Sequence, residues 1–310
     1  MNSQFNKPKG FGEILDLTFR LSKNHFKHFL LIFLILIGPI FLVQALMELL
    51  TGTNFFREVG TGSNWFEQII SSFDQSFFES EAEMAEFDVI GTLMLIVIGI
   101  LSFFLVPIAD AAVLIAINHI RLNEEYTVKN VIKKAFTRYW AIIGSTLLFW
   151  IISFGIIVLP AIILVTSGFF VSIMNIWASI IMSLIFLVGF GLLIGYLLIR
   201  WSFYFGAVVL EDDALGLSRS WQLTRNRGWV LIGLFITLFI ILGIVGSAFE
   251  FTFGALLGNS VLFTLIVSLV TLFTSMVNAV AFAVIFFDLR TRHDGDDLKE
   301  LIHEYDVIQK

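Results

Sequence analysis

Asp110 is the carboxylate in this sequence that is best placed to do chemistry in an apolar environment. It lies three residues after Pro107 and eleven residues before Arg121, within a long apolar run. A helix rises by about 1.5 Å per residue, so Asp110 would lie roughly 16 Å from Arg121, near the middle of a bilayer. An ionised carboxylate is costly there. We therefore expect Asp110 to face a bundle interior, to be protonated, or to pair with a base such as Arg200.

Asn278 would share this depth, because it lies twelve residues before Arg290 in another apolar run. An amide at that depth can serve helix packing through a hydrogen bond, and a buried carboxyl can serve the same purpose. Asp110, Asn278 and Arg200 are therefore a candidate intramembrane polar site that is either functional or structural.

The patterns of known catalytic centres are missing from the sequence. There is no HExxH, no GxSxG and no phosphate-binding glycine loop, and the chain has no cysteine. Its five histidines are scattered near the ends of apolar runs. The Glu124-Glu125 pair falls in a turn, away from any second ionisable group of a catalytic set. We expect no catalytic residue, no metal site and no cofactor, and so no enzyme.

The composition predicts a membrane protein. Hydrophobic residues make up 58% of the chain and charged residues 14%, with a mean hydropathy of +0.92. Soluble domains have about half apolar and about a quarter charged residues. No linker or low-complexity tract divides the 310 residues, so we expect one integral membrane domain over 1–310.

Apolar runs of sufficient length predict an all-α bundle with six crossings. A crossing needs about 20 apolar residues. We place the crossings within a membrane region 29–287, near 29–50, 89–118, 140–166, 177–200, 229–249 and 260–287. The fourth crossing either ends near Arg200 or continues to Leu210.

The basic residues set the orientation. Of 19 Lys and Arg residues, only Arg57 lies in a segment that we assign to the outside, the acidic loop 51–88. The positive-inside rule then places residues 1–28 and the amphipathic tail 288–310 in the cytoplasm, with the chain in the cell membrane. Within the external loop, Phe66, Ile69 and Phe73 predict an amphipathic helix; a solvated acidic loop is the alternative.

Interfacial helices are expected to precede the crossings. Each would bury one stripe at helical offsets zero, three, four and seven, and four stretches show this pattern. They begin at Ile14, Val128, Ala214 and Leu298, with Glu13, Thr127, Asp213 and Asp297 as acidic or capping residues just before them.

These stretches also suggest an internal repeat. Ser22-Lys23, Thr137-Arg138 and Thr224-Arg225 each lead into a crossing. An interfacial helix followed by a membrane hairpin would thus occur three times, with a fourth interfacial helix at the end. Convergence of unrelated amphipathic helices is the alternative.

Three stretches resemble a known family: FGEILDLTFRLSKNHF, RWSFYFGAVVLEDDALGLSRSWQLTRNRGW and FFDLRTRHDGDDL. The family is the membrane domain found with some bacterial glycerophosphoryl diester phosphodiesterases and in many stand-alone membrane proteins, and the resemblance extends over essentially the whole chain. The matching positions are Glu13, Asp16, Arg20, Arg200, Glu211, Ala214, Ser218, Trp221, Leu223, Thr224, Asp288, Arg290, Gly295 and Asp297. Where the family often has a proline before the glutamate, this chain has Gly206.

The resemblance implies a membrane protein without the enzyme's separate soluble barrel, so the phosphodiesterase activity does not carry over. We expect a non-enzymatic accessory, scaffold or partner subunit that contacts anionic lipid headgroups at the cytoplasmic face, with a possible protein partner. The alternative is a transporter or lipid-handling carrier that uses the polar site around Asp110. Nucleic acid is not expected as a partner, because the basic residues are spread over separate juxtamembrane segments.

Overall fold

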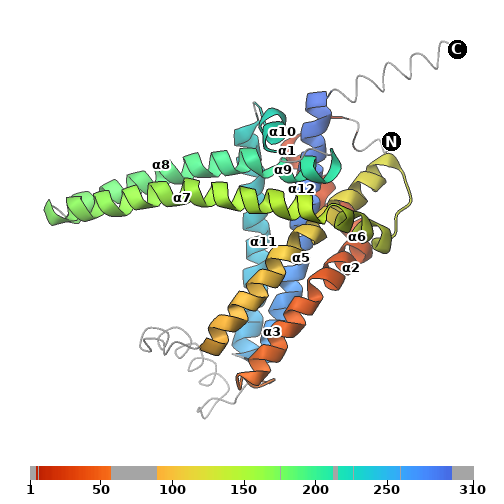
Figure 1. Ribbon diagram of the computed structural model, residues 1–310, viewed down its shortest axis with the longest axis horizontal. Helices are drawn as coiled ribbons and strands as arrows, with labels where there is room; N and C mark the ends of the chain where they lie inside the picture. Colours follow the sequence, from red (N-terminus) through yellow and green to blue (C-terminus); the bar gives the residue numbers. More distant parts are fainter. Residues whose placement is uncertain are drawn as a thin grey trace. The chain divides into compact units, whose positions relative to one another are not determined.

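All elements in the described part of the chain are helices, which confirms the all-α prediction (Figure 1). Helices satisfy their backbone hydrogen bonds within one segment, as apolar runs in a bilayer require. The computed structural model describes residues 5, 7–56, 89–174, 176–211, 216–225, 227–258 and 260–294.

Within the described residues, five helical stretches are long and apolar enough to cross a membrane. A sixth crossing results if the bent pair α2 and α3 counts as one span. In the expected fourth crossing, α8 ends at Ser202 and a separate short helix, α9, follows to Leu210, while the apolar stretch as a whole extends over Ile176–Leu210. The bounds are α2 Phe26–Leu36, α3 Gly38–Leu50, α5 Val89–Leu122, α7 Tyr139–Met174, α8 Ile176–Ser202, α9 Tyr204–Leu210, α11 Gly228–Leu257 and α12 Val261–Asp294.

The expected first crossing is broken at Ile37, where α2 and α3 meet at an angle of 50°. Pro39 lies in the first turn of α3, where its missing N–H costs nothing but its ring prevents a continuous helix. Pro107 and Pro160, by contrast, lie inside the unbroken helices α5 and α7. Prolines in crossings are tolerated when neighbouring groups satisfy the freed carbonyls.

The chain forms two compact units, and four of its helices contribute to both. One unit, the tail-end unit, comprises Met1–Leu17, Leu114–Ile236 and Ala281–Lys310. The other, the loop-end unit, comprises Thr18–Val113 and Thr237–Val280. In the loop-end unit the first N–H groups of α12 are satisfied from outside the helix: Val261 and Leu262 donate to the carbonyls of Asn54 and Phe55, each at 3.1 Å.

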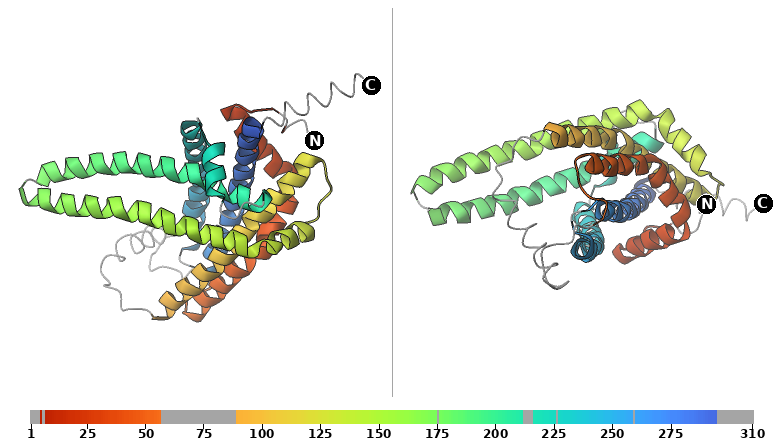
Figure 2. Two further views of the ribbon diagram at one scale, coloured as in Figure 1. Left: turned by 45° about the horizontal axis from the view of Figure 1, so that its top comes forward. Right: turned by 90° about the horizontal axis from the view of Figure 1, so that it is seen from below.

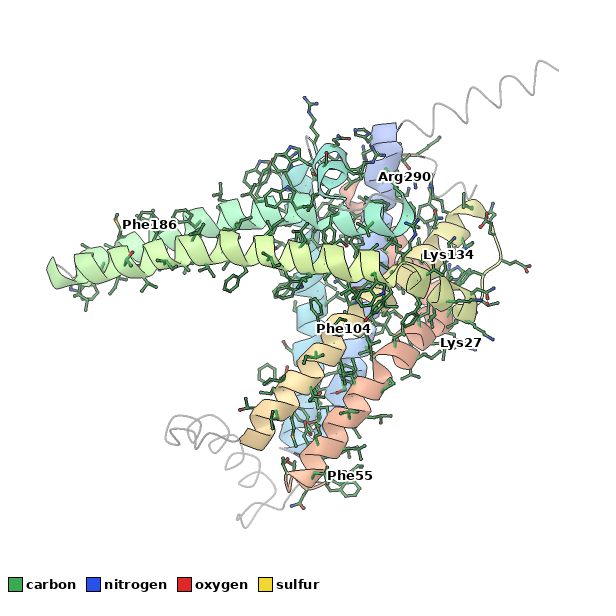
Figure 3. The ribbon with its side chains drawn as sticks, viewed as in Figure 1. Lys27, Phe55, Phe104, Lys134, Phe186 and Arg290 are labelled. Carbon is green, nitrogen blue, oxygen red and sulfur yellow. The ribbon has the colours of Figure 1, made fainter. Side chains whose placement is uncertain are left out.

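The tail-end unit contains a long antiparallel hairpin of α7 and α8 (Figure 2). Phe186 and Phe190 stack one turn apart on α8, at 5.6 Å between ring centroids (Figure 3). The aromatic core of the unit lies elsewhere, between α9 and the end of α12. There Phe203 stacks on Phe282 at 5.2 Å, and Phe286 is completely buried.

Four interfacial helices were expected, and three of them lie within the described residues: α1 Phe11–Asn24, α6 Val128–Thr137 and α10 Leu217–Leu223. The first stripe is confirmed, because Ile14, Leu17, Thr18 and Leu21 are each at most 3% exposed. The Thr127 cap is confirmed as well, since its hydroxyl accepts from the backbone N–H of Asn130 at 3.3 Å.

The start of α10 corrects a prediction. The helix was expected from Ala214, capped by Asp213, but it begins at Leu217 after Gly216, whose φ of +63° lies in the left-handed region. Residues 212–215 lie outside the described residues, as do 57–88 of the external loop and 295–310 of the tail with its expected amphipathic helix.

Candidate functional site

Arg200, Glu211, Thr224, Asp288 and Arg290, which are motif positions among the described residues, lie in the tail-end unit at or near the ends of helices. Their contacts fall into two groups. One is centred on Arg200 at the end of α8. The other, which we call the helix-end cluster, consists of Lys9, Glu211, Arg219, Arg227, Asp288, Arg290 and Arg292.

Arg200 binds the C-terminal end of α10. Its side chain is buried, with the residue 9% exposed. Its Nε donates to the hydroxyl of Thr224 at 3.3 Å, and its Nη2 donates to the carbonyl of Trp221 at 3.1 Å. The last carbonyls of a helix have no partner within the helix, and the negative end of the helix dipole favours a cation. Arg200 therefore caps α10.

The backbone of Arg200 is held by the same helix. Since α8 ends at Ser202 and α9 begins only at Tyr204, the last carbonyls of α8 need partners. The hydroxyl of Ser220 donates to the Arg200 carbonyl at 2.7 Å, and the Thr224 hydroxyl approaches it at 3.4 Å. Side chain and backbone of Arg200 thus both bind α10.

Two glycines allow this close packing. A Cβ at Gly206 in α9 would overlap the ring of Phe286. A Cβ at Gly216 would overlap the carbonyl of Tyr204, in addition to the strain of its positive φ. Gly206, which stands where the family often has a proline, is therefore required for the contact between α9 and α12. The interruption between α8 and α9 lies three residues earlier, at Phe203.

Arg138 performs a similar role for α9. Its Nη1 donates to the carbonyls of Val208 and Val209, at 2.8 and 3.3 Å. These carbonyls belong to the last turn of α9, whose final residue is Leu210. The arginine that follows α6 in sequence thus caps a helix some seventy residues away, a contact that the sequence pattern did not predict.

Glu211 links α10 to α12. One oxygen, Oε2, accepts from the Nε of Arg219 at 2.9 Å. The other, Oε1, lies 3.4 Å from the Nε of Arg290, an ion-pair distance without hydrogen-bond geometry. Arg219 and Arg290 are both partly exposed, so each pair is screened by solvent on one side.

Asp288 joins the N-terminal segment to α12. Its side chain is 2% exposed. One oxygen accepts from the backbone N–H of Lys9 at 2.7 Å, and the other accepts from the Nε of Arg292 at 2.8 Å. Arg292 closes the ring by donating from Nη2 to the carbonyl of Lys9 at 2.6 Å. Arg227 lies farther away, at 3.9 Å.

Helix geometry explains which charged residues of this part of α12 pair with each other. Residues two apart on a helix point to different sides, whereas residues four apart share a face. Asp288 accordingly pairs with Arg292, and Arg290 pairs with Glu211. The four-residue offset could have been read from the sequence. The contacts to Lys9 and Arg219 could not, because they depend on how distant segments meet.

The cluster has more cations than carboxylates, five against two. Burial lowers the pKa of the Lys9 ammonium, and the nearby Asp288 carboxylate opposes that shift only partly. Burial also lowers the pKa of the Arg227 guanidinium, with a further contribution from Arg292. Both shifts show chiefly that burying these cations has an electrostatic cost, to which the neighbouring Arg292 adds a smaller contribution.

Asp110 and Asn278 lie in the loop-end unit. Asp110 is half-buried in α5 and makes no hydrogen bond or ion pair within the described part of the chain. Asn278 is exposed on α12 rather than sealed between helices. The contacts of Arg200 with Thr224 and Trp221 all lie in the tail-end unit. An intramembrane polar site around Asp110 stays a prediction.

A family match covers most of the cluster. The membrane domain of glycerophosphoryl diester phosphodiesterase matches residues 82–298, more than half of the 310 residues. The chain belongs to this family. Arg200, Glu211, Asp288 and their neighbouring motif positions lie within the matched range, whereas Glu13, Asp16 and Arg20 lie outside it. No curated protein and no solved structure matches the chain.

In this membrane-domain family member, the site residues hold helices together. Both oxygens of Asp288 accept hydrogen bonds, and both oxygens of Glu211 face arginines. Within the described residues, no group of three or more His, Cys, Asp or Glu could hold a metal ion. The arrangement is suited to fixing the geometry of helix ends by charge and hydrogen bonding.

Proposed function

We propose that this chain is a non-enzymatic subunit of the cell membrane that holds a protein partner at its cytoplasmic face. One observation carries the proposal: Arg200, Glu211 and Asp288 use their charged groups in contacts within the chain. A general acid or base must instead reach a substrate. Charged motif positions that tie helix ends together favour a scaffold.

The proposal includes a threading of the chain. The bent pair α2 and α3 is one span, so the chain crosses six times and both termini are cytoplasmic. The distribution of Lys and Arg supports this topology. A threefold repeat of a surface helix and a membrane hairpin is supported by the element order, in which α1, α6 and α10 each precede two long helical segments.

The exposed face of α10 is the surface that we assign to the partner. Ser218, Trp221 and Gln222 are exposed at offsets zero, three and four, so they lie on one side of α10, and the exposed Arg225 follows just after the helix ends. Ser218 makes no hydrogen bond within the described part of the chain. Unlike Thr224, this motif position makes no polar contact with any described residue, and its exposed side chain is available to another molecule.

Purification from the native host in mild detergent, after brief crosslinking, tests the proposal. We expect one protein to co-purify in a fixed ratio with the wild-type chain. Ser218→Glu, which adds bulk and charge to this face, should release it. The matched control Asn24→Glu, at an exposed position at the end of α1, should retain it. Wild-type protein that elutes folded and alone would contradict the scaffold.

A carrier is the second candidate, and it rests on Asp110. A half-buried carboxylate without a partner in the described residues, one turn after Pro107, has the character of a proton or ion site. Proton flux into vesicles under an imposed potential tests this candidate. Flux that Asp110→Asn abolishes would favour the carrier, and equal flux in both proteins would remove its main support.

A further inference from the structure

Helix α6 carries three exposed lysines, Lys129, Lys133 and Lys134. None of them forms an ion pair within the described residues. In the preceding turn, Glu124 contacts His119 at 2.7 Å, and the exposed Glu125 forms no ion pair within the described residues. The opposite side of α6 is buried through Val131 and Ala135. The helix therefore has one fixed face and a cationic surface that nothing described neutralises.

Two of the lysines share a stripe with an aromatic residue. Lys129, Lys133 and Phe136 lie at offsets zero, four and seven, which places them on one side of the helix. At 3.6 residues per turn, Lys134 points about 100° away from Lys133, outside this stripe. Figure 3 labels Lys134 on α6. The chain thus offers its own control lysine.

The aromatic neighbours place the stripe at the level of lipid headgroups. Phe136 is 43% exposed and Trp140 is 81% exposed. Phe136 stacks on Tyr139 at 6.1 Å, and Tyr139 is the first residue of the long apolar helix α7. Aromatic residues at the end of a membrane span gather at the interface, and lysines extend their charged ends toward headgroups there.

We propose that Lys129, Lys133 and Phe136 form a binding stripe for the headgroups of anionic phospholipids. The ammonium groups meet the phosphates, and the phenylalanine ring lies against the upper part of the acyl chains. Each lysine near such a surface contributes about a fivefold preference for anionic over zwitterionic lipid. The inference rests on the proposed function only for the cytoplasmic placement of α6.

A local fluorescence experiment tests the stripe. The chain has no cysteine, so a single cysteine at the exposed Thr137, next to Phe136, can carry a fluorophore. The full-length protein is placed in phosphatidylcholine vesicles that contain an equal share of headgroup-nitroxide phosphatidylglycerol or headgroup-nitroxide phosphatidylcholine. We expect stronger quenching by the phosphatidylglycerol probe. In Lys129→Gln/Lys133→Gln the preference should fall by about fivefold for each lysine removed, whereas Lys134→Gln should keep it.

Two results would overturn the stripe: equal quenching by both probes in protein with its native lysines, or an unchanged preference in the double variant. Equal quenching is the result expected if an acidic protein segment, and not lipid, covers the stripe. The outcome is independent of partner purification. If a partner co-purifies and both probes quench equally, the lipid-binding stripe is wrong and the scaffold proposal is unaffected. If the phosphatidylglycerol probe quenches more strongly and no partner co-purifies, the scaffold proposal is wrong and the stripe is unaffected.

Discussion

The guanidinium carbon of Arg200 lies 3.4 Å from the centre of the Trp221 ring. The same side chain donates to the Trp221 carbonyl, and the Arg200 carbonyl accepts from Ser220. A planar cation over an indole ring is attracted by the negative face of the ring, more strongly when water is excluded. The end of α8 and the short helix α10 therefore hold each other through stacking, side-chain and backbone contacts.

Arg200→Lys should destabilise the protein although it keeps the charge. A lysine ammonium cannot stack flat on Trp221 while donating to both the Thr224 hydroxyl and the Trp221 carbonyl. We expect a loss of about 1–3 kcal/mol, measured as a lower thermal unfolding midpoint in detergent. Ser218→Ala, at an exposed position on the same helix, serves as the control and should change little. An unchanged midpoint in Arg200→Lys would show that the stacking contributes nothing.

Asp288→Asn should also lower stability, because it removes a buried negative charge from cationic and N–H partners. An asparagine amide keeps an acceptor oxygen for only one of the two donors, the Lys9 N–H and the Arg292 guanidinium, and it turns its NH2 group toward the other. Hydrogen bonds to charged groups contribute about 1.5–3 kcal/mol, and the partly exposed Arg292 places the expected loss at the lower end. Protease cleavage of the N-terminal segment should become faster in the variant. A cleavage rate equal to wild type would contradict the tie between Lys9 and Asp288.

Gly206→Ala tests the close approach of α9 and α12. The new methyl group would overlap the fully buried ring of Phe286, and overpacking of this kind costs about 1–3 kcal/mol. Gly191→Ala is the matched control, since a Cβ at Gly191 on α8 meets nothing within 4 Å. Thermal unfolding should separate the two variants, with Gly191→Ala at or slightly above the wild-type midpoint. Equal midpoints would mean that Phe286 moves aside freely.

Lys9 should make stability depend on alkaline pH. Its pKa in the folded protein lies below the ordinary value of 10.5, chiefly because of burial. Between the folded pKa and about 10.5 the unfolded chain binds more protons, so the free energy of unfolding rises with pH across that window. Lys9→Met removes this contribution and keeps the backbone contacts to Asp288 and Arg292. The wild-type midpoint should therefore rise relative to Lys9→Met as the pH approaches 10.5. Parallel pH profiles would contradict the burial of this ammonium.

Local patterns predicted much of the fold. Apolar runs gave the long helices, and the offsets of Ile14, Leu17 and Leu21 gave the buried side of α1, because a helical period can be read from neighbouring residues. The break in the first crossing has a local cause in Pro39, yet prolines at Pro107 and Pro160 leave their helices unbroken. Whether a proline breaks a membrane helix depends on the groups around it.

For the site, the sequence predicted which residues matter but not which residues contact each other. Arg200, Glu211, Thr224 and Asp288 were singled out, but the pairing of Arg200 with Thr224, of Glu211 with Arg219 and of Asp288 with Lys9 depends on how separate elements pack. The start of α10 was placed too early, because Gly216 adopts a left-handed conformation that ends the helical pattern, at a place where the Tyr204 carbonyl leaves no room for a Cβ. Such contacts arise from tertiary packing, which periodicity does not encode.

The cytoplasmic placement of α6 and α10 is the claim on which both proposals depend, and single-cysteine labelling of this cysteine-free chain tests it most directly. Cysteines are introduced at the exposed positions Lys134 and Arg225, and at Phe56 after α3, in otherwise native protein. With a membrane-impermeant maleimide, Phe56→Cys should react in intact cells, while Lys134→Cys and Arg225→Cys should react only after permeabilisation. Labelling of position 134 or 225 in intact cells would contradict the account.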